Sequence, residues 1–338
     1  MGTPIARNLG FELVRATEAA ALAAGRWMGR GDKNAVDGAA VRAMRAALIA
    51  VDMDGIVVIG EGEKDEAPML YLGERIGNGL APVVDVAVDP VDGTRALAKG
   101  LPNAVSVVAL SERGTMYYPG HVAYMEKIAV GPACRGDIDL TASVAQNLKW
   151  IARSKNSAID DLTVVVLDRP RHDHLIAEIR QAGARVKLIQ DGDVAGAIMA
   201  ALPDTGVDVL MGTGGSPEAV VAACALKCLG GEMQCRLWPR NEVERQQALT
   251  DGLDLGRVLS VDDLVSGKDV FFAATGVSDG EFLKGVRYFS HGAHTQSIVM
   301  RSYSGTIRMV EADHNFEKLQ KITEVYDHGE DVGAAADH

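Results

Sequence analysis

Acidic residues are concentrated directly after two apolar segments that are rich in β-branched residues. Residues 61–66 contain four carboxylates in six positions after the first segment. Asp89 and Asp92 follow the second segment, in the order Asp-Pro-Val-Asp-Gly-Thr. Proline at the second position and glycine at the fifth predict a tight turn, which would hold Asp89 and Asp92 close together.

Two carboxylates held close together repel each other, so either one takes up a proton or a cation lies between them. Hard divalent cations prefer oxygen ligands, and an all-carboxylate cluster therefore predicts Mg²⁺ or Mn²⁺ rather than Zn²⁺. Glu218, in the first turn of a predicted helix, is a further candidate ligand, although it could simply complement the helix dipole. Asp37, at the start of another predicted helix, has the alternative interpretation of an N-cap.

A glycine-rich segment, residues 212–218, joins a predicted strand to a predicted helix. Ser216 fits the N-cap position and Pro217 the first helical position, and the backbone N–H groups of such a terminus can hold phosphate. The glycine spacing does not match the GxGxxG pattern of dinucleotide-binding folds. This mismatch argues against a nucleotide-dependent oxidoreductase.

Two further loops, residues 168–173 and 191–193, follow neighbouring predicted strands. Arginine presents a fork of donors that suits phosphate, and aspartate accepts hydrogen bonds from sugar hydroxyls. In a parallel sheet these loops and the glycine-rich segment share one edge, where they would form a cleft for a hydroxylated phosphate ester. His172 and His174 are predicted to belong to a solvated turn rather than to a metal site.

The elements that must position these residues follow from the hydrophobic pattern. Apolar residues at helical spacing predict a helix over residues 8–29 and a second one with a stripe from Val41 to Val51. Short β-branched runs predict strands over residues 55–60, 83–88 and 105–110. From residue 162 the pattern alternates between strand and helix, in the order 162–167, 174–182, 185–189, 194–202, 207–211 and 217–229. This alternation predicts an α/β fold with a parallel sheet covered on both faces, and residues 297–310 predict a hairpin.

Composition limits the class of protein. The chain has 338 residues, 47% of them hydrophobic, and its 34 Lys and Arg against 46 Asp and Glu give a net charge of −12. We therefore expect a globular, cytoplasmic protein that binds neither nucleic acid as its main partner nor an anionic membrane. The four cysteines lack a paired CxxC spacing and are predicted to be buried free thiols.

Taken together, the motifs resemble the class II fructose-1,6-bisphosphatases of bacteria, within the metal-dependent phosphatase superfamily that also includes inositol monophosphatases. The resemblance runs from about residue 8 to residue 312. The segments that carry it are residues 29–34, 60–70, 89–94, 124–127, 169–173, 191–193 and 214–218.

The resemblance implies a role for individual residues. Those similar to metal ligands are Asp37, Glu61, Asp89, Asp92 and Glu218. Thr94 matches the residue that orients the attacking water, and Lys33 and Asp65 match residues implicated in catalysis. The positions similar to the substrate-binding residues are Asp92, Gly93, Thr94, Tyr124, Arg169, Pro170, Arg171, Asp191, Gly192, Asp193 and Gly215. Many members of the family have Glu at the position of Asp92, so this chain carries a carboxylate that is one methylene shorter.

The resemblance also implies an activity and an architecture. The activity is metal-dependent hydrolysis of the 1-phosphate of fructose 1,6-bisphosphate, a step of gluconeogenesis, by a homodimer or homotetramer with Mg²⁺ or Mn²⁺. Sedoheptulose 1,7-bisphosphate or an inositol phosphate as substrate, and a non-catalytic phosphosugar-binding protein, are the alternatives. The fold is a layered α/β/α/β/α arrangement of two domains. Residues 1–158 would carry most metal carboxylates, residues 159–328 the phosphosugar loops and Glu218, and residues 329–338 a disordered tail.

Overall fold

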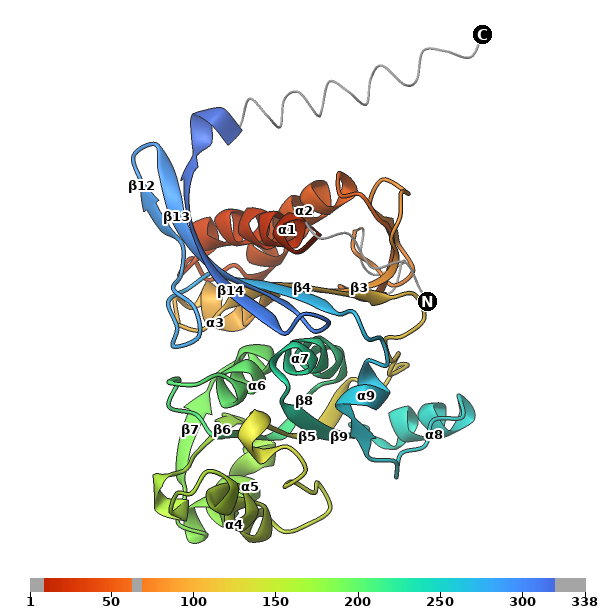
Figure 1. Cartoon of the computed structure of the whole chain (residues 1–338), viewed down its shortest axis with the longest axis vertical. Helices are drawn as coiled ribbons and strands as arrows, with labels where there is room; N and C mark the ends of the chain where they lie inside the picture. The colour runs from red at the N-terminus through yellow and green to blue at the C-terminus, as the bar shows by residue number, and fades with distance from the viewer. Residues whose placement is uncertain (1–8, 63–68, 320–338) are drawn as a thin grey trace.

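Helices and sheets alternate in layers along the long axis of the molecule. The computed structural model describes residues 9–62 and 69–319 (Figure 1). Helices α1 (Leu9–Ala24) and α2 (Lys33–Ile49) cover the outer face of a first sheet, and α4 (Val144–Ser154) and α5 (Asp173–Gln181) cover the outer face of a second. Helices α6 (Asp193–Ala201) and α7 (Ser216–Leu229) lie between the sheets. The predicted α/β/α/β/α layering is confirmed.

The first sheet has the strand order β12-β13-β11-β4-β3-β1-β2, with β14 paired to β13. Strands β1 and β3 are parallel, whereas the other neighbours are antiparallel. Strands β13 and β14 pair from Gly292↔Asn315 to Arg301↔Thr306, which confirms the predicted hairpin. The strand bounds are β1 Asp54–Ile59, β2 Arg75–Ile76, β3 Val83–Asp92, β4 Val105–Glu112, β11 Phe271–Gly276, β12 Arg287–Phe289, β13 Gly292–Arg301 and β14 Thr306–Asn315.

The second sheet has the order β10-β9-β5-β8-β6-β7. Its βαβ series is parallel as predicted, since β6 runs parallel to both β7 and β8. The sheet as a whole is mixed, because β5, which precedes this series in the chain, inserts antiparallel between β8 and β9. The strand bounds are β5 Tyr124–Val130, β6 Thr163–Leu167, β7 Arg185–Ile189, β8 Val209–Gly215, β9 Glu232–Leu237 and β10 Leu259–Ser260.

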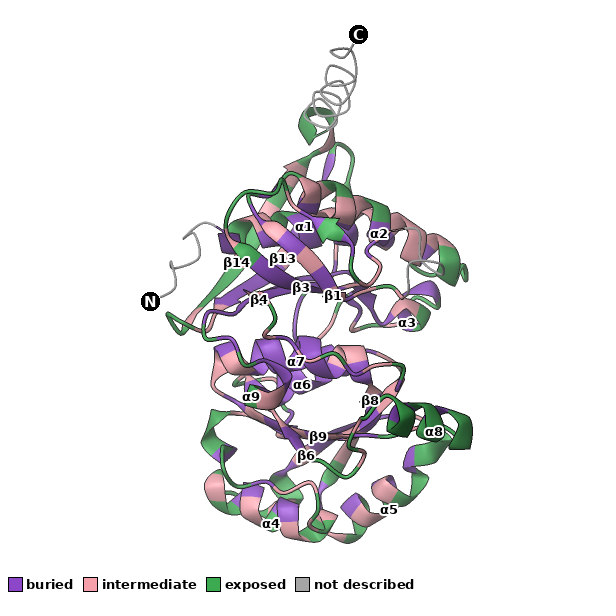
Figure 2. Cartoon of the chain, turned by 90° about the vertical axis from the view of Figure 1, so that its right-hand side faces the viewer, coloured by how far each residue is buried: buried purple, intermediate pink, exposed green. Residues whose placement is uncertain are grey.

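The two central helices are apolar on almost every side because both sheets pack against them. All nine residues of α6 are buried, and most of α7 is buried as well (Figure 2). The largest apolar core therefore lies between the sheets, with further cores under α1 and α2 and under α4 and α5. Three further helices, α3 (Thr94–Ala98), α8 (Glu242–Thr250) and α9 (Val261–Leu264), complete the described α-helices.

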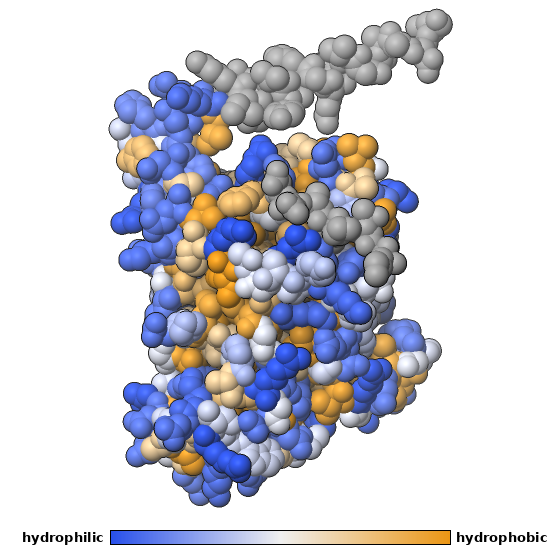
Figure 3. Space-filling model, in the orientation of Figure 1, coloured by the Kyte–Doolittle hydropathy of each residue, from blue (hydrophilic) through white to orange (hydrophobic). Residues whose placement is uncertain are grey.

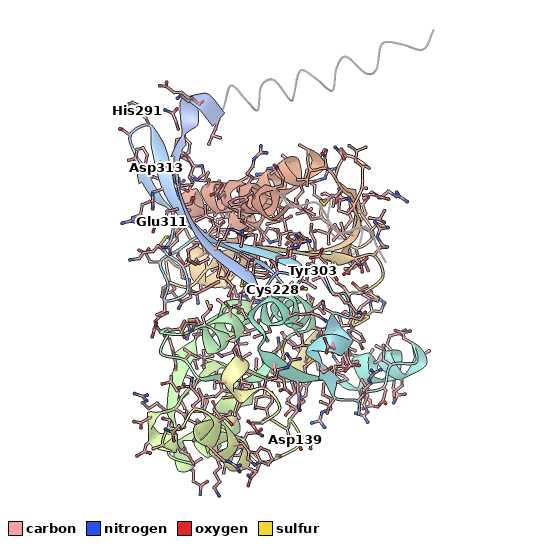
Figure 4. All side chains as sticks on the ribbon, viewed as in Figure 1. Asp139, Cys228, His291, Tyr303, Glu311 and Asp313 are labelled. Atoms are coloured by element: carbon pink, nitrogen blue, oxygen red, sulfur yellow. The ribbon has the colours of Figure 1, made fainter. Side chains whose placement is uncertain are left out.

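The first predicted helix is shorter than expected. It ends at Ala24 and is followed by a 3₁₀ turn over Gly25–Trp27. All four cysteines are free and buried, as predicted, and Cys228 lies on α7 in the middle layer (Figure 4). No helix within the described ranges is both long and apolar enough to cross a membrane.

The division between the sheets does not coincide with residue 158. Strand β5 and helix α4 precede this residue but belong with the second sheet, and the chain returns to the first sheet at β11–β14. The division into domains 1–158 and 159–328 therefore stays a prediction, and its boundary differs from the boundary between the two sheets. The tail at residues 329–338 lies outside the described residues.

Candidate active site

A cleft of about 480 Å³ is lined by residues from both sheets, at the ends of β1, β3, β6 and β8 and the start of β5. It gathers nearly every residue that the motifs single out. Those lining it are Lys33, Asp37, Glu61, Asp89, Asp92, Gly93, Thr94, Tyr124, Arg169, Arg171, Asp191, Gly192, Asp193, Gly215 and Glu218. Pro170 is not among the lining residues, and Asp65 lies outside the described part of the chain.

A β-bulge, rather than the predicted tight turn, places Asp89 and Asp92. Strand β3 continues through both residues, and its pairing with β4 shifts by one residue between Asp89↔Val107 and Asp92↔Val105. The turn prediction is wrong because pairing with β4 keeps the backbone extended, while the bulge accommodates a proline that has no N–H to donate. Asp92 is only 4% exposed, and its Oδ2 accepts a hydrogen bond from the backbone N of Ala195 at the start of α6 (3.3 Å).

Asp37 is not the cap of its helix. Asp32 is the N-cap of α2, since its side chain accepts a hydrogen bond from the backbone N of Ala35 at 3.0 Å. Asp37 lies further along the helix, where its Oδ2 is 3.6 Å from the Nζ of Lys33. The capping interpretation is therefore wrong, and the Asp37 carboxylate is left facing the cleft.

The carboxylate of Glu218 lies against the backbone of Gly215. Strand β8 extends to Gly215, so the predicted glycine loop is strand, and Gly215 rather than Ser216 is the N-cap of α7. Pairing with β5, from Tyr124↔Gly215 onward, holds this segment extended. A Cβ at Gly215 would lie 1.7 Å from Oε2 of Glu218. That oxygen is buried and has no hydrogen-bond partner among the described residues.

The cleft disfavours ionised carboxylates in the absence of a cation. Burial, together with the negative charges of Asp92 and Glu218, raises the pKa of Asp89 well above its usual value. Burial and Asp193 likewise raise the pKa of Asp92. Burial is also the main cause that raises the pKa of Glu61 and of Glu218 to about 7, although part of each residue's surface is accessible in the cleft.

These carboxylates suit a hard divalent cation. The donors are oxygen atoms only, one of them is buried and unpartnered, and their mutual repulsion raises their pKa values. Within residues 9–62 and 69–319, no group of three or more acidic, histidine or cysteine side chains is arranged to hold a metal ion by itself. The remaining positions would therefore fall to water or substrate oxygens, as is usual for Mg²⁺.

Cationic and aromatic groups form a second side of the cleft lining. The Nε and Nη2 atoms of Arg171 donate to the backbone O of Thr213 at 3.1 and 2.7 Å, and the guanidinium lies 4.8 Å from the ring centroid of Tyr124. The ring of Trp238 contacts Tyr124 edge-on, with centroids 6.3 Å apart. Arg169 approaches Asp191, with Nη2 3.5 Å from Oδ1. Both guanidiniums are thus oriented before any ligand binds.

Lys127 contacts two residues of the cleft lining, and the sequence motifs assign it no role. It is 3% exposed, and its Nζ donates to Oδ2 of Asp193 at 2.6 Å and to the backbone O of Gly215 at 2.9 Å. Lys127 lies on the same face of β5 as Met125 and Ala129, and all three residues are buried. The sequence signal that could have identified Lys127 is a lysine on a buried strand face, because lysine is almost never buried without a partner.

Comparison with known proteins extends the similarity beyond the cleft. The family model for bacterial fructose-1,6-bisphosphatase, glpX-encoded, matches residues 7–314. The chain is 47% identical to fructose-1,6-bisphosphatase class 2 of Haemophilus influenzae, over 94% of this chain and 99% of that protein. It is 43% identical to fructose-1,6-bisphosphatase 1 class 2 of Escherichia coli K12, over 95% and 99% respectively. The similarity therefore covers almost the whole chain.

Proposed function

Since the chain belongs to the family of bacterial, glpX-encoded fructose-1,6-bisphosphatases, we propose that its cleft hydrolyses fructose 1,6-bisphosphate to fructose 6-phosphate and phosphate. This is a phosphoric monoester hydrolysis of gluconeogenesis. The observation that carries the proposal is the division of one cleft into mutually repelling carboxylates and preoriented arginines. Such a division suits a substrate with a reacting phosphate at one end and a second phosphate at the other.

The metal would be Mg²⁺ or Mn²⁺. Its ligands would be the acidic residues of the cleft, Asp37, Glu61, Asp89, Asp92 and Glu218. When bound, such a cation neutralises phosphoryl oxygens and activates water for attack on phosphorus. The buried and unpartnered Oε2 of Glu218 supports this assignment.

Thr94 would orient the attacking water. Its Oγ1 donates to the backbone O of Val91 at 2.9 Å, so the hydroxyl proton is already used and the oxygen is left to accept a hydrogen bond. A water that donates to this oxygen presents its lone pair to phosphorus. Lys33 lies beside Asp37 and would offset charge that develops on the phosphoryl group, and Asp65 keeps its predicted catalytic role.

The remaining lining residues would hold the sugar and its distal phosphate. Arg169 and Arg171 offer guanidinium donors to the 6-phosphate, and Tyr124 supports the second of these. Asp191 would accept hydrogen bonds from sugar hydroxyls, whereas Asp193 already accepts one from Lys127. Backbone around Gly93, Gly192 and Gly215 would allow close approach of substrate, and Pro170 would shape the loop between the two arginines.

The test is phosphate release from fructose 1,6-bisphosphate in Mg²⁺, in Mn²⁺ and in chelator. We expect release in at least one metal and none in chelator. Sedoheptulose 1,7-bisphosphate and an inositol monophosphate are compared with it by their specificity constants. Release that persists in chelator, or a preference for another ester, would contradict the proposal. Substrate binding without release would instead identify a phosphosugar-binding protein.

We further propose a cytoplasmic homodimer or homotetramer. Apolar side chains gather on the face over which β14 runs (Figure 3), where Ile307 and Met309 are 44% and 54% exposed. Exposed apolar groups on a sheet favour burial against a second copy. Light scattering coupled to size-exclusion chromatography should give a mass of two or four chains, and a monomer would contradict this proposal.

A further inference from the structure

A buried histidine, His172, bridges a gap in the second sheet next to Arg171. Strand β6 pairs with all of β7, but it pairs with β8 only at Val164↔Val209 and Val165↔Leu210. Beyond this point the two strands separate, which leaves their facing backbone groups without ladder partners. The imidazole of His172 fills the gap and is 3% exposed. The prediction of a solvated turn is therefore wrong for His172, although the side chain of His174 is exposed as expected.

The two ring nitrogens of His172 replace the missing ladder hydrogen bonds. Nδ1 lies 2.7 Å from the backbone O of Leu167, at the end of β6, and the backbone N of Thr213 on β8 donates to Nε2 at 2.8 Å. A carbonyl can only accept and a backbone N–H can only donate, so the ring must be neutral with its proton on Nδ1. Burial lowers the pKa of His172, which agrees with a neutral ring.

The peptide that His172 fixes is the one that holds Arg171. The backbone N of Thr213 binds His172, and its backbone O accepts both hydrogen bonds from Arg171. Gly212 permits this approach, since a Cβ there would lie 3.1 Å from Nε2 of His172. A continuous chain of contacts therefore runs from the end of β6 through His172 and Thr213 to the guanidinium.

We propose that His172 is a positioning residue, which sets specificity for a substrate with a second, distal phosphate by holding Thr213 and thereby Arg171 in place. This inference rests on the proposed function, in which Arg171 binds the distal phosphate. His172 itself does not line the cleft. Its removal should therefore weaken recognition of the distal phosphate and leave the hydrolytic end of the cleft less affected.

The experiment compares fructose 1,6-bisphosphate with fructose 1-phosphate, which lacks the distal phosphate. We expect His172→Ala to raise the Michaelis constant for the bisphosphate about tenfold, with a smaller change in kcat, and to lower the preference for bisphosphate over monophosphate. Arg171→Ala should lower the same preference. The double variant should show no further loss beyond Arg171→Ala alone, because both changes remove one interaction.

Two conservative variants separate positioning from a general structural role. A glutamine side chain places its amide near the position of Nε2 and can accept from the backbone N of Thr213, whereas an asparagine amide reaches only the Nδ1 position beside Leu167. We expect His172→Gln to restore the preference for bisphosphate and His172→Asn not to restore it. Thermal unfolding of all variants provides the measure of folding.

Three results would overturn the proposal while the wild-type enzyme remains active on the bisphosphate. These are an equal loss with both substrates, equal behaviour of the Gln and Asn variants, and a double variant whose losses are additive. Failure of the proposed function is distinguishable, because the wild-type protein would then release no phosphate from the bisphosphate in either metal.

Discussion

The two sides of the cleft are built on opposite electrostatic principles. On one side, Asp89, Asp92 and Glu218 repel one another, and an oxygen of Glu218 has no partner in the described structure. On the other side, Arg171 donates to Thr213 and stacks on Tyr124. The carboxylate side is thus incomplete without a cation, whereas the arginine side is already ordered in the protein alone.

This difference explains how a chain of net charge −12 can accept a bisphosphate. Unneutralised carboxylates would repel the substrate, and bound divalent cations reverse their local sign. The arginine side needs no such change, because its donors are in place beforehand. We therefore expect the two sides to respond differently to substitution, metal removal and pH.

The largest expected effect comes from the carboxylate side. Asp89→Asn keeps the shape of the side chain but removes a charge at the bulge of β3, and turnover should fall about a thousandfold or more in saturating metal. Phosphate release under saturating substrate measures this. Thr115, whose hydroxyl donates to the backbone O of Glu112, lies outside the cleft, and Thr115→Ser serves as the control. If the turnover of Asp89→Asn were within tenfold of wild type, Asp89 would not be a metal ligand.

Lys127 contacts Asp193 and the backbone of Gly215 and should matter most for stability. Lys127→Met leaves the buried Asp193 carboxylate without its ammonium partner, which costs about 3–5 kcal/mol of unfolding free energy. Combining it with Asp193→Leu should recover much of that loss, because replacing a buried pair by apolar groups is often neutral. Denaturant unfolding of the metal-free proteins checks both values. No recovery in the double variant would mean that the pair stabilises the fold beyond mutual neutralisation.

The carboxylate side could be predicted from the sequence because its signals are local. Asp89 and Glu61 each follow a β-branched run. The carboxyl ends of neighbouring parallel strands lie at one edge of a sheet, so these two residues are expected to lie near each other. The conformation between Asp89 and Asp92 could not be predicted, because it depends on pairing with β4. A local Pro–Gly pattern favours a turn, and the sheet overrides it.

The arginine side was less predictable because its contacts are nonlocal. The position of β5 between β8 and β9 fixes Tyr124 and Lys127, and nothing near these residues specifies an antiparallel neighbour from a later segment. His172 has polar neighbours in the sequence, which favours a solvated turn. Its burial follows from the separation of β6 from β8, which only the assembled sheet reveals.

Arg171 should affect binding more than turnover. Arg171→Ala is expected to raise the Michaelis constant for fructose 1,6-bisphosphate by about tenfold to a hundredfold, since in the proposed binding mode it would remove charged hydrogen bonds to the distal phosphate. Arg171→Lys keeps the charge but loses the planar fork and the stacking on Tyr124, so it should recover only part of the loss. Steady-state kinetics separate the two parameters. An unchanged Michaelis constant would mean that Arg171 does not bind the distal phosphate.

The smallest expected effect is a pH dependence of stability that metal reverses. In the fold, burial raises the pKa of Glu218 and of Glu61 to about 7 from a usual value of 4.5, so the native protein retains protons that the unfolded chain has lost. The contribution of these two carboxylates to the stability of the metal-free protein should therefore fall as pH rises from about 4.5 to about 7 and then level off. Bound cations favour the ionised carboxylates. The increase in melting temperature on addition of metal should therefore become larger over the same pH interval.

Two variants assign this dependence to the cleft. Glu218→Gln should flatten the pH profile of the melting temperature in chelator and reduce the gain from added Mn²⁺. Glu18 is a matched control, because burial raises its pKa to about 7 as well, but it lies beside Thr295 and His314 and does not line the cleft. Glu18→Gln should flatten the profile with and without metal and leave the gain from metal unchanged. If Glu218→Gln behaved in the same way as Glu18→Gln, the carboxylates of the cleft would not be the groups that metal relieves, and the contrast between the two sides would lose its electrostatic basis.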